Sequence, residues 1–340
     1  MTLTKKERFS QIMTGHKADR PIVSGWHHFL EHEHTATDLV NVTIAFAKQY
    51  DWDWIKINPR ATYLAEAFGN QYDYTNYEWV FPSQLKAVIE HSSDLKQVTA
   101  VHVDVSAPFQ EQFEVVKQLR RQLNDTPLVQ TLFSPLTVLM FLAGLMPYSD
   151  KTMPGSQATI DFNAWLVNHR SDIHFALYNI AVTLADYVQR LEHLGVDGLF
   201  YATTGTAHPE LFTVEQFNEF SRPYDMMVLQ AFKKKGRILH TCGAHGDPVR
   251  FNDYPVEGIS WDPDATGNPE LSVQLDKVKV AGVSHHIFES STDDSLIKKQ
   301  AKLALAEMKN QPFLLVPNCA VSPNASASAL KALRESIDYV

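Results

Sequence analysis

The chain has 340 residues, a length that fits a single α/β barrel of about 250 residues enlarged by insertions. Hydrophobic residues make up 44% of it and charged residues 20%, which is typical of a globular protein and excludes a disordered one. The 30 basic and 39 acidic residues give a net charge of −9, so we expect no nucleic-acid partner and no anionic membrane partner. The 2 cysteines are too few for a disulfide framework, and no apolar stretch is long enough to cross a bilayer. We therefore expect a soluble, cytoplasmic protein with reduced thiols.

Strand-like and helix-like segments alternate along the chain. An amino-terminal helix follows the capping-box-like sequence Thr4-Lys-Lys-Glu7. Eight strands are expected after it, at residues 21–23, 54–57, 128–133, 196–201, 237–239, 258–261, 283–288 and 313–316. Helical patterns are expected at residues 173–193, 214–233, 269–278 and 295–308.

This alternation predicts the fold class, because strands separated by helices pair in parallel through right-handed crossovers. We expect an α/β fold in which residues 1–340 form a single (β/α)₈ TIM barrel, with an open doubly wound sheet as the alternative. Residues 63–125, between the second and third strands, are expected to hold an insertion with an extra helix and a hairpin near residues 100–105.

Both cysteines of the chain follow predicted strands. The fifth strand leads into His240-Thr241-Cys242, and the eighth leads into Asn318-Cys319. The carboxyl ends of barrel strands share one rim, so these side chains can converge on one ion. One imidazole and two thiolates are the ligands of a catalytic zinc with an open fourth position. The alternatives are that both cysteines are small buried apolar residues, or that they form a disulfide, which a reducing compartment disfavours.

A resemblance to a known family is carried by short segments in a fixed order. Asp19-Arg20-Pro21 precedes the first strand, Phe133-Ser134-Pro135 follows the third, and residues 195–200 and 217–224 span the fourth strand and the next helix. In this order the segments resemble the uroporphyrinogen decarboxylase superfamily over nearly the whole chain. The resemblance implies a TIM-barrel fold.

The decarboxylase branch of that superfamily differs from this chain at its polar residues. Its members carry arginines after the first strand, where residues 25–31 of this chain contain none. They carry an aspartate after the second strand, where this chain reads Lys56-Ile57-Asn58-Pro59-Arg60, and a histidine where this chain has Cys319. A tetrapyrrole with many carboxylates would find few cationic partners here.

The other branch comprises zinc-dependent methyltransferases that move a methyl group from a corrinoid protein to coenzyme M. Its pattern of His-x-Cys with a distant cysteine, also found in cobalamin-independent methionine synthase, is matched by His240, Cys242 and Cys319. The resemblance therefore implies zinc as the cofactor, with a corrinoid supplied by a partner protein. Zinc lowers the pKa of a bound thiol, and thiolate ligands keep that sulfur nucleophilic. The sequence Phe288-Glu289 departs from this branch, which usually has Asn or Asp in that turn.

Further side chains at the expected rim are secondary candidates. Asp262 and Glu289 are candidate catalytic residues, as a fourth zinc ligand or a substrate contact, although an aspartate before a proline is commonly a turn residue. His27, His28, Tyr201 and Thr203 are candidate substrate-binding residues. His285 and His286 are expected to alternate in a strand, so that one points inward. The expected rim residues are Asn58, Ser134, Thr203, His240, Asp262, Glu289 and Cys319.

Three functions remain open at this point. The first is a zinc-dependent methyltransferase that acts on a small-molecule thiol or methylated substrate, with a corrinoid protein or small compound as methyl donor. The second is a decarboxylase of tetrapyrrole carboxylates, and the third is a barrel that binds its ligand without turnover. We expect a homodimer as the oligomeric form.

Overall fold

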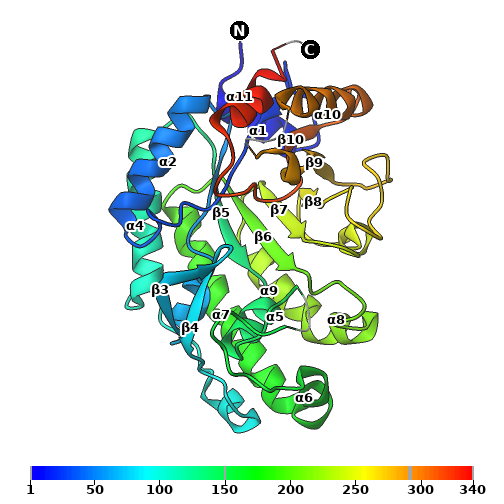
Figure 1. The fold of residues 1–340 in the computed structure, drawn as a ribbon. Helices are drawn as coiled ribbons and strands as arrows, with labels where there is room; N and C mark the ends of the chain where they lie inside the picture. Colours follow the sequence, from blue (N-terminus) through cyan, green and yellow to red (C-terminus); the bar gives the residue numbers. More distant parts are fainter. Residues whose placement is uncertain (1, 149–150, 290–292, 339–340) are drawn as a thin grey trace.

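The computed structural model describes residues 2–148, 151–289 and 293–338. A curled sheet of eight parallel strands in the order β1-β10-β9-β8-β7-β6-β5-β2 forms its centre (Figure 1). The strands of this sheet are β1 (Ile22–Val23), β2 (Ile55–Ile57), β5 (Leu128–Phe133), β6 (Gly198–Thr204), β7 (Arg237–Thr241), β8 (Gly258–Ser260), β9 (Val278–Val283) and β10 (Phe313–Pro317). The prediction of an α/β fold with eight parallel strands is confirmed.

Helices pack around the outside of this sheet (Figure 1). The α-helices are α1 (Lys5–Met13), α2 (Ala36–Tyr50), α3 (Tyr63–Ala67), α4 (Ala107–Gln122), α5 (Pro135–Leu142), α6 (Phe162–Asn168), α7 (Arg170–His193), α8 (Val214–Phe220), α9 (Arg222–Ala231), α10 (Asp294–Glu307) and α11 (Ala327–Glu335). The 3₁₀ helices are η1 (Ser92–Gln97), η2 (Pro248–Phe251) and η3 (His285–Ile287). Residues 242–257 and 261–277, all of them described, contain no α-helix. No helix in the described part of the chain is long and apolar enough to cross a membrane.

Alternation along each strand divides the apolar side chains between two cores. On β2 and the residue before it, Trp54 points into the sheet's interior, whereas Ile55 and Ile57 face the helices. The interior core also contains Phe9 and Ile12 of α1, so this first helix covers one end of the curled sheet. The larger core lies between the sheet and the surrounding helices.

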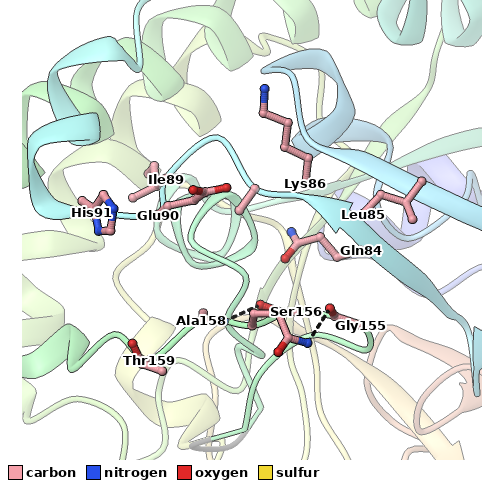
Figure 2. Close-up of a pocket in the computed structure, with 12 residues that line it drawn as sticks. Gln84, Leu85, Lys86, Ile89, Glu90, His91, Gly155, Ser156, Ala158 and Thr159 are labelled. Carbon is pink, nitrogen blue, oxygen red and sulfur yellow. Dashed lines mark hydrogen bonds between the residues drawn. The ribbon is translucent and has the colours of Figure 1, made fainter.

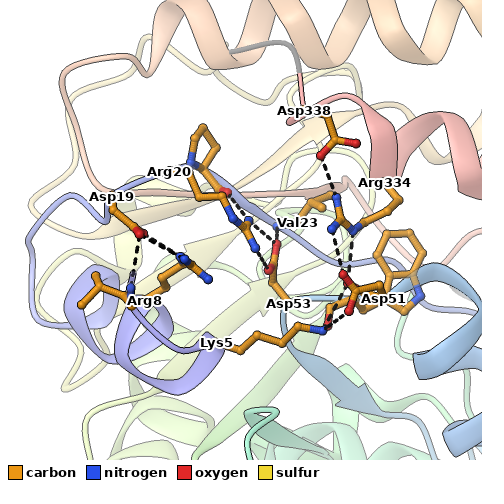
Figure 3. A network of polar contacts seen from close by, with 12 residues as sticks. Lys5, Arg8, Asp19, Arg20, Val23, Asp51, Asp53, Arg334 and Asp338 are labelled. Carbon is orange, nitrogen blue, oxygen red and sulfur yellow. Dashed lines mark hydrogen bonds and ion pairs between the residues drawn. The ribbon is translucent and has the colours of Figure 1, made fainter. Parts of the chain in front are cut away.

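The edges of the sheet, β1 and β2, are joined by short-range polar contacts. The amide of Asp53 donates to the carbonyl of Val23 at 3.1 Å, and the hydroxyl of Ser24 donates to the carbonyl of Trp54 at 2.6 Å. The carboxylate of Asp53 accepts the amide of Val23 and both terminal nitrogens of Arg20 (Figure 3). These bonds bring the two edges together, and with the strand order they are consistent with a TIM-like barrel.

Two predicted elements are wrong in the carboxyl-terminal half. The strand expected at residues 283–288 lies at Val278–Val283, and residues 285–287 form η3 instead. The sequence did not indicate this strand because a lysine, Lys279, interrupts its apolar residues. In the structure the ammonium of Lys279 is buried and donates a hydrogen bond to the carbonyl of Leu271 at 2.7 Å. Residues 269–278 form no helix, because Leu271 and its apolar neighbours pack onto the core from a loop.

The region after β2 also differs from the expectation. The hairpin predicted near residues 100–105 is wrong, since the hairpin is formed by β3 (Gln71–Glu78) and β4 (Phe81–Lys86), beside the main sheet (Figure 1). The end of β4 borders a cleft formed with residues 155–159 (Figure 2). Gly155 has a φ of +75°, and a Cβ there would meet the carbonyl oxygen of Gln84 at 2.8 Å, which explains the glycine. This cleft contains none of the predicted site residues.

The single helix expected over residues 214–233 is interrupted at Ser221, between α8 and α9.

Candidate metal centre

Three predicted ligands converge at the carboxyl ends of β7 and β10. The sulfurs of Cys242 and Cys319 are 3.5 Å apart, and the Cys319 sulfur is 3.8 Å from Nε2 of His240. All three ligand atoms lie within 4.8 Å of one another. Tetrahedral zinc with Zn–S of about 2.3 Å and Zn–N of about 2.0 Å separates two sulfurs by roughly 3.8 Å and a sulfur from a nitrogen by roughly 3.6 Å. The three side chains therefore fit one zinc ion with little movement.

Neighbouring strands fix the orientation of these ligands. Nδ1 of His240 lies 3.0 Å from the hydroxyl oxygen of Ser260 on β8, which leaves Nε2 directed at the cysteines. The amide of Cys242 donates to the carbonyl of Thr204 on β6 at 2.8 Å. A histidine whose second nitrogen is hydrogen-bonded holds one tautomer and one ring orientation, as metal-binding histidines do.

The two thiols have unequal acidities. Their mutual hydrogen bond lowers the pKa of Cys319, and the bond from His240 lowers it further. The same sulfur–sulfur bond raises the pKa of Cys242, and burial and the nearby Asp262 carboxylate add to the increase. Cys319 is therefore the thiol that loses its proton first, and a cation at this position would favour deprotonation of both.

A pocket lined mainly by aromatic rings opens onto the three ligands. The aromatic residues that line it are Trp26, Tyr63, Trp79, Phe81, Phe133, Tyr148 and Phe200. Among the described residues that line this pocket there is no aspartate or glutamate. Its lysine and its arginine differ: Arg60 is paired with the carboxylates of Glu66 and Glu111, whereas no carboxylate of the described residues is paired with Lys56.

The sequence model of the family described as uroporphyrinogen decarboxylase (URO-D) matches residues 4–339. The chain belongs to this family. Among solved structures, it is similar to a methyltransferase from Methanosarcina mazei, with a TM-score of 0.77, 18% identity, and coverage of 99% of each chain. It is also similar to a B12-independent methionine synthase from Shewanella sp. W3-18-1, with a TM-score of 0.57, 14% identity, and coverage of 94% of this chain and 97% of that one. These likenesses concern the fold. No curated protein sequence matches the chain.

Within this member of the URO-D family, the two predicted histidines after β1 have different surroundings. His28 lines the pocket, with Nδ1 3.3 Å from a carboxylate oxygen of the buried Glu33. His27 does not line the pocket: it packs against the rings of Phe29 and Phe46. Burial lowers the pKa of His27, so it is a neutral core residue. The prediction that His27 contacts substrate is not supported by this position.

The two residues predicted on β6 also lie outside the pocket. Phe200 and Ala202 line it, so alternation turns Tyr201 and Thr203 to the outer face of the sheet. The hydroxyl of Tyr201 donates to the buried Asp225 on α9 at 2.5 Å. Thr203 donates to the carbonyl of His240 at 3.3 Å, which supports the strand that carries this ligand. Neither side chain lines the pocket, so the assignment of Tyr201 and Thr203 as substrate-binding residues stays a prediction, and the contacts that the structure shows for them are structural.

Asp262 and Glu289 occupy different environments at the ends of their strands. Asp262 is buried beside the cysteines, and its Oδ1 accepts the side-chain amide of Asn318 at 2.9 Å. Its Oδ2 lies 3.7 Å from Nδ1 of His285, and with His286 these residues form a second group able to hold a cation. The two histidines lie in η3 and not in a strand, so the predicted alternation of their side chains is wrong. Glu289 is exposed, pairs with Ala325 through an isolated bridge, and does not line the pocket.

Sequence reasoning gave no role to Lys56. Its side chain is buried, with Nζ 4.7 Å from the ring centre of Phe200 and 5.5 Å from that of Trp26. Burial lowers the pKa of Lys56 to about 7, although the nearby thiols of Cys319 and Cys242 oppose this decrease. The sequence could have indicated that Lys56 points inward. Side chains alternate along a strand, so Lys56 lies on the same face as Trp54, and the isoleucines on either side of it lie on the opposite face.

Proposed function

We propose that this protein is a zinc-dependent methyltransferase, in which a substrate thiol is activated to accept a methyl group from a corrinoid protein or a small methyl donor. The observation that carries the proposal is the convergence of His240, Cys242 and Cys319 in the lining of a largely apolar pocket. The family membership and the similarity of the fold to a methyltransferase and a methionine synthase support it. We further propose that the curled sheet is a complete (β/α)₈ barrel with an insertion after β2.

The residues of the chain have distinct tasks in this proposal. His240, Cys242 and Cys319 would hold the zinc, which when bound supplies a Lewis acid that lowers the pKa of a thiol. Ser260 orients the imidazole of His240. The charge of the buried Asp262 acts on Cys242, and this carboxylate is our proposed acceptor of the thiol proton or fourth ligand. The aromatic lining keeps bulk water away from the sulfur, which preserves its nucleophilicity.

The alternative of tetrapyrrole decarboxylation is disfavoured by charge. Of the pocket's two basic residues, Arg60 is already bound by two carboxylates, so one cation remains for a substrate with many carboxylates. We expect no conversion of uroporphyrinogen under anaerobic conditions.

Metal content and methyl transfer test the proposal together. After dialysis, we expect about one zinc ion per chain in the wild type and almost none in Cys242→Ser or Cys319→Ser, because each replacement removes one of three protein ligands. Methylation of a thiol by methylcobalamin should be lost in the same variants. His208→Asn is the matched control, since the ring of this histidine packs edge to face against His245 outside the pocket. Wild-type protein without zinc, or thiol methylation that survives both cysteine replacements, would contradict the proposal.

A further inference from the structure

We propose that Lys56 and Asn58 form a subsite for a carboxylate carried by the ligand whose thiol reaches the metal centre. The inference rests on the proposed function for the thiol end of the ligand. It names the chemistry of the other end, which the family membership does not specify for this chain.

The two side chains share the inner face at the end of β2. They are two residues apart in an extended segment, so both point into the pocket that Cys242 and Cys319 also line. Nζ of Lys56 donates a hydrogen bond to Oδ1 of Asn58. This bond sets the orientation of the Asn58 side-chain amide, and it leaves the other atom of that amide, the donor Nδ2, unused. The two donor groups therefore lie next to each other.

The side chains of Lys56 and Asn58 have hydrogen-bond donors that lack a protein acceptor among the described residues. Asn58 is 3% exposed, and its Nδ2 is a buried donor without a hydrogen-bond partner. Lys56 is 8% exposed, and beyond Asn58 its ammonium faces two aromatic rings. Buried polar groups are normally paired, and an unpaired buried donor costs about 1–3 kcal/mol. A ligand that accepts hydrogen bonds from both groups would remove this cost.

The charge of the pocket favours an anion over a neutral acceptor. The described lining residues include no carboxylate that could pair with Lys56. Two thiolates would cancel the charge of a divalent metal ion, so the loaded metal centre would leave the lysine without a counterion. Two neighbouring donor atoms match the two oxygens of a carboxylate, and hydrogen bonds to a charged acceptor are the strong ones.

Three other polar side chains of the pocket already have partners. Arg60 is bound by Glu66 and Glu111, and the hydroxyl of Thr131 donates to the carbonyl of Ile57 at 2.6 Å. The hydroxyl of Tyr63 donates to the carbonyl of Thr131 at 2.7 Å. None of these contacts uses the Nδ2 donor of Asn58 or the ammonium of Lys56.

Calorimetric titration of zinc-loaded protein with short thiols tests the subsite. The probes are 3-mercaptopropionate, 2-mercaptoethanesulfonate, 2-mercaptoethanol and cysteamine, which differ in the charge and shape of the group opposite the thiol. We expect 3-mercaptopropionate to bind the wild type most tightly and to lose roughly 10- to 100-fold in affinity in Lys56→Met, as for a lost hydrogen bond to a charged group. Asn58→Leu should weaken the same thiol less, and cysteamine should gain affinity in Lys56→Met.

A matched control separates this effect from damage to the fold. Lys279→Met also removes a buried strand lysine, but one whose ammonium binds the carbonyl of Leu271 and does not line the pocket. It should leave all four affinities unchanged. Unchanged binding of 3-mercaptopropionate by a folded Lys56→Met variant would overturn the subsite, and tighter binding of the sulfonate would overturn the choice of a carboxylate.

The two proposals fail in different ways. If all four thiols bind equally and are methylated, thiol activation stands and the carboxylate subsite is wrong. Propionate, which has no thiol, tests the carboxylate subsite without the metal. Its binding to the metal-free Cys319→Ser variant should weaken when Lys56→Met is added. This result could be obtained even if no thiol binds the zinc-loaded wild type. In that case the subsite stands and the proposed function is wrong.

Discussion

Asp225 is a buried carboxylic acid outside the metal centre whose environment makes it sensitive to pH. It lies on α9 and accepts hydrogen bonds from the hydroxyls of Tyr201, Ser221 and Tyr254. Burial raises the pKa of Asp225 to about 6, and the three hydrogen bonds only partly oppose this increase. The folded state therefore retains a proton on this group at pH values where the unfolded chain has lost it.

Replacing Asp225 with asparagine should flatten the dependence of stability on pH. Because its pKa is higher in the folded state, the wild type gains stability from this group below about pH 4 and loses it as the pH rises through about 6. Between pH 5 and pH 7, urea unfolding should show the wild type losing about 1 kcal/mol relative to Asp225→Asn. Asp253→Asn is the control, since Arg222 lowers the pKa of Asp253 and its titration falls below this window. Parallel curves for wild type and Asp225→Asn would contradict the argument.

At the same scale, the sequence indicated three candidate metal ligands that the structure brings together, but it did not separate pocket-facing from helix-facing residues on the strands. His240, Cys242 and Cys319 could be found because their chemistry is rare and each lies at or just after the carboxyl end of a strand. Phe200 lines the pocket and Tyr201 faces the helices, and the sequence could not distinguish these positions because they differ by one residue and both faces of this strand are buried. In a strand buried on both sides, polarity does not mark the inward face.

Among the elements, the β3–β4 hairpin stands out because its turn places an aromatic residue in an unfavourable conformation. Trp79 has a φ of +57°, is 57% exposed, and lies at the first position of a two-residue turn. Such turns favour glycine, since a side chain in the left-handed region is strained. The indole lines the pocket above the metal ligands and packs on Phe81, with ring centres 6.1 Å apart. The backbone strain at Trp79 therefore occurs at a residue whose indole ring contributes to the pocket.

A pair of variants should reveal this strain. Trp79→Gly and Trp79→Ala both remove the indole, but only glycine relaxes in the left-handed region. Trp79→Gly should therefore be the more stable of the two by roughly 1 kcal/mol in urea unfolding. Both should weaken binding of a thiol to the zinc-loaded protein to the same extent, because both remove the ring from the pocket. If Trp79→Ala were as stable as Trp79→Gly, the turn would hold no strain.

For the molecule as a whole, the ends of the chain meet where the two edges of the sheet meet. Asp51 binds Lys5 of α1 at 2.5 Å and Arg334 of α11 at 2.9 Å, and two residues later Asp53 binds Arg20 at 2.6 Å (Figure 3). The sequence indicated the parallel strands of this sheet through their spacing, but not the residues that join its edges. An ion pair between positions 33 residues apart leaves no periodic pattern.

Asp53→Asn should therefore destabilise the protein far more than Asp51→Asn, although both remove one charge from the same network. Asp53 is fully buried, and without its charge Arg20 loses its partner and the amide of Val23 competes for a single oxygen. Breaking such a buried pair costs about 3 kcal/mol. Asp51 is 65% exposed at its side chain, so its two ion pairs contribute less than about 1 kcal/mol. Its φ of +51° is one that asparagine tolerates, so Asp51→Asn adds no backbone strain. Urea unfolding of both variants measures the difference, and equal losses of stability would mean that the contacts of Asp53 do not hold the edges of the sheet together.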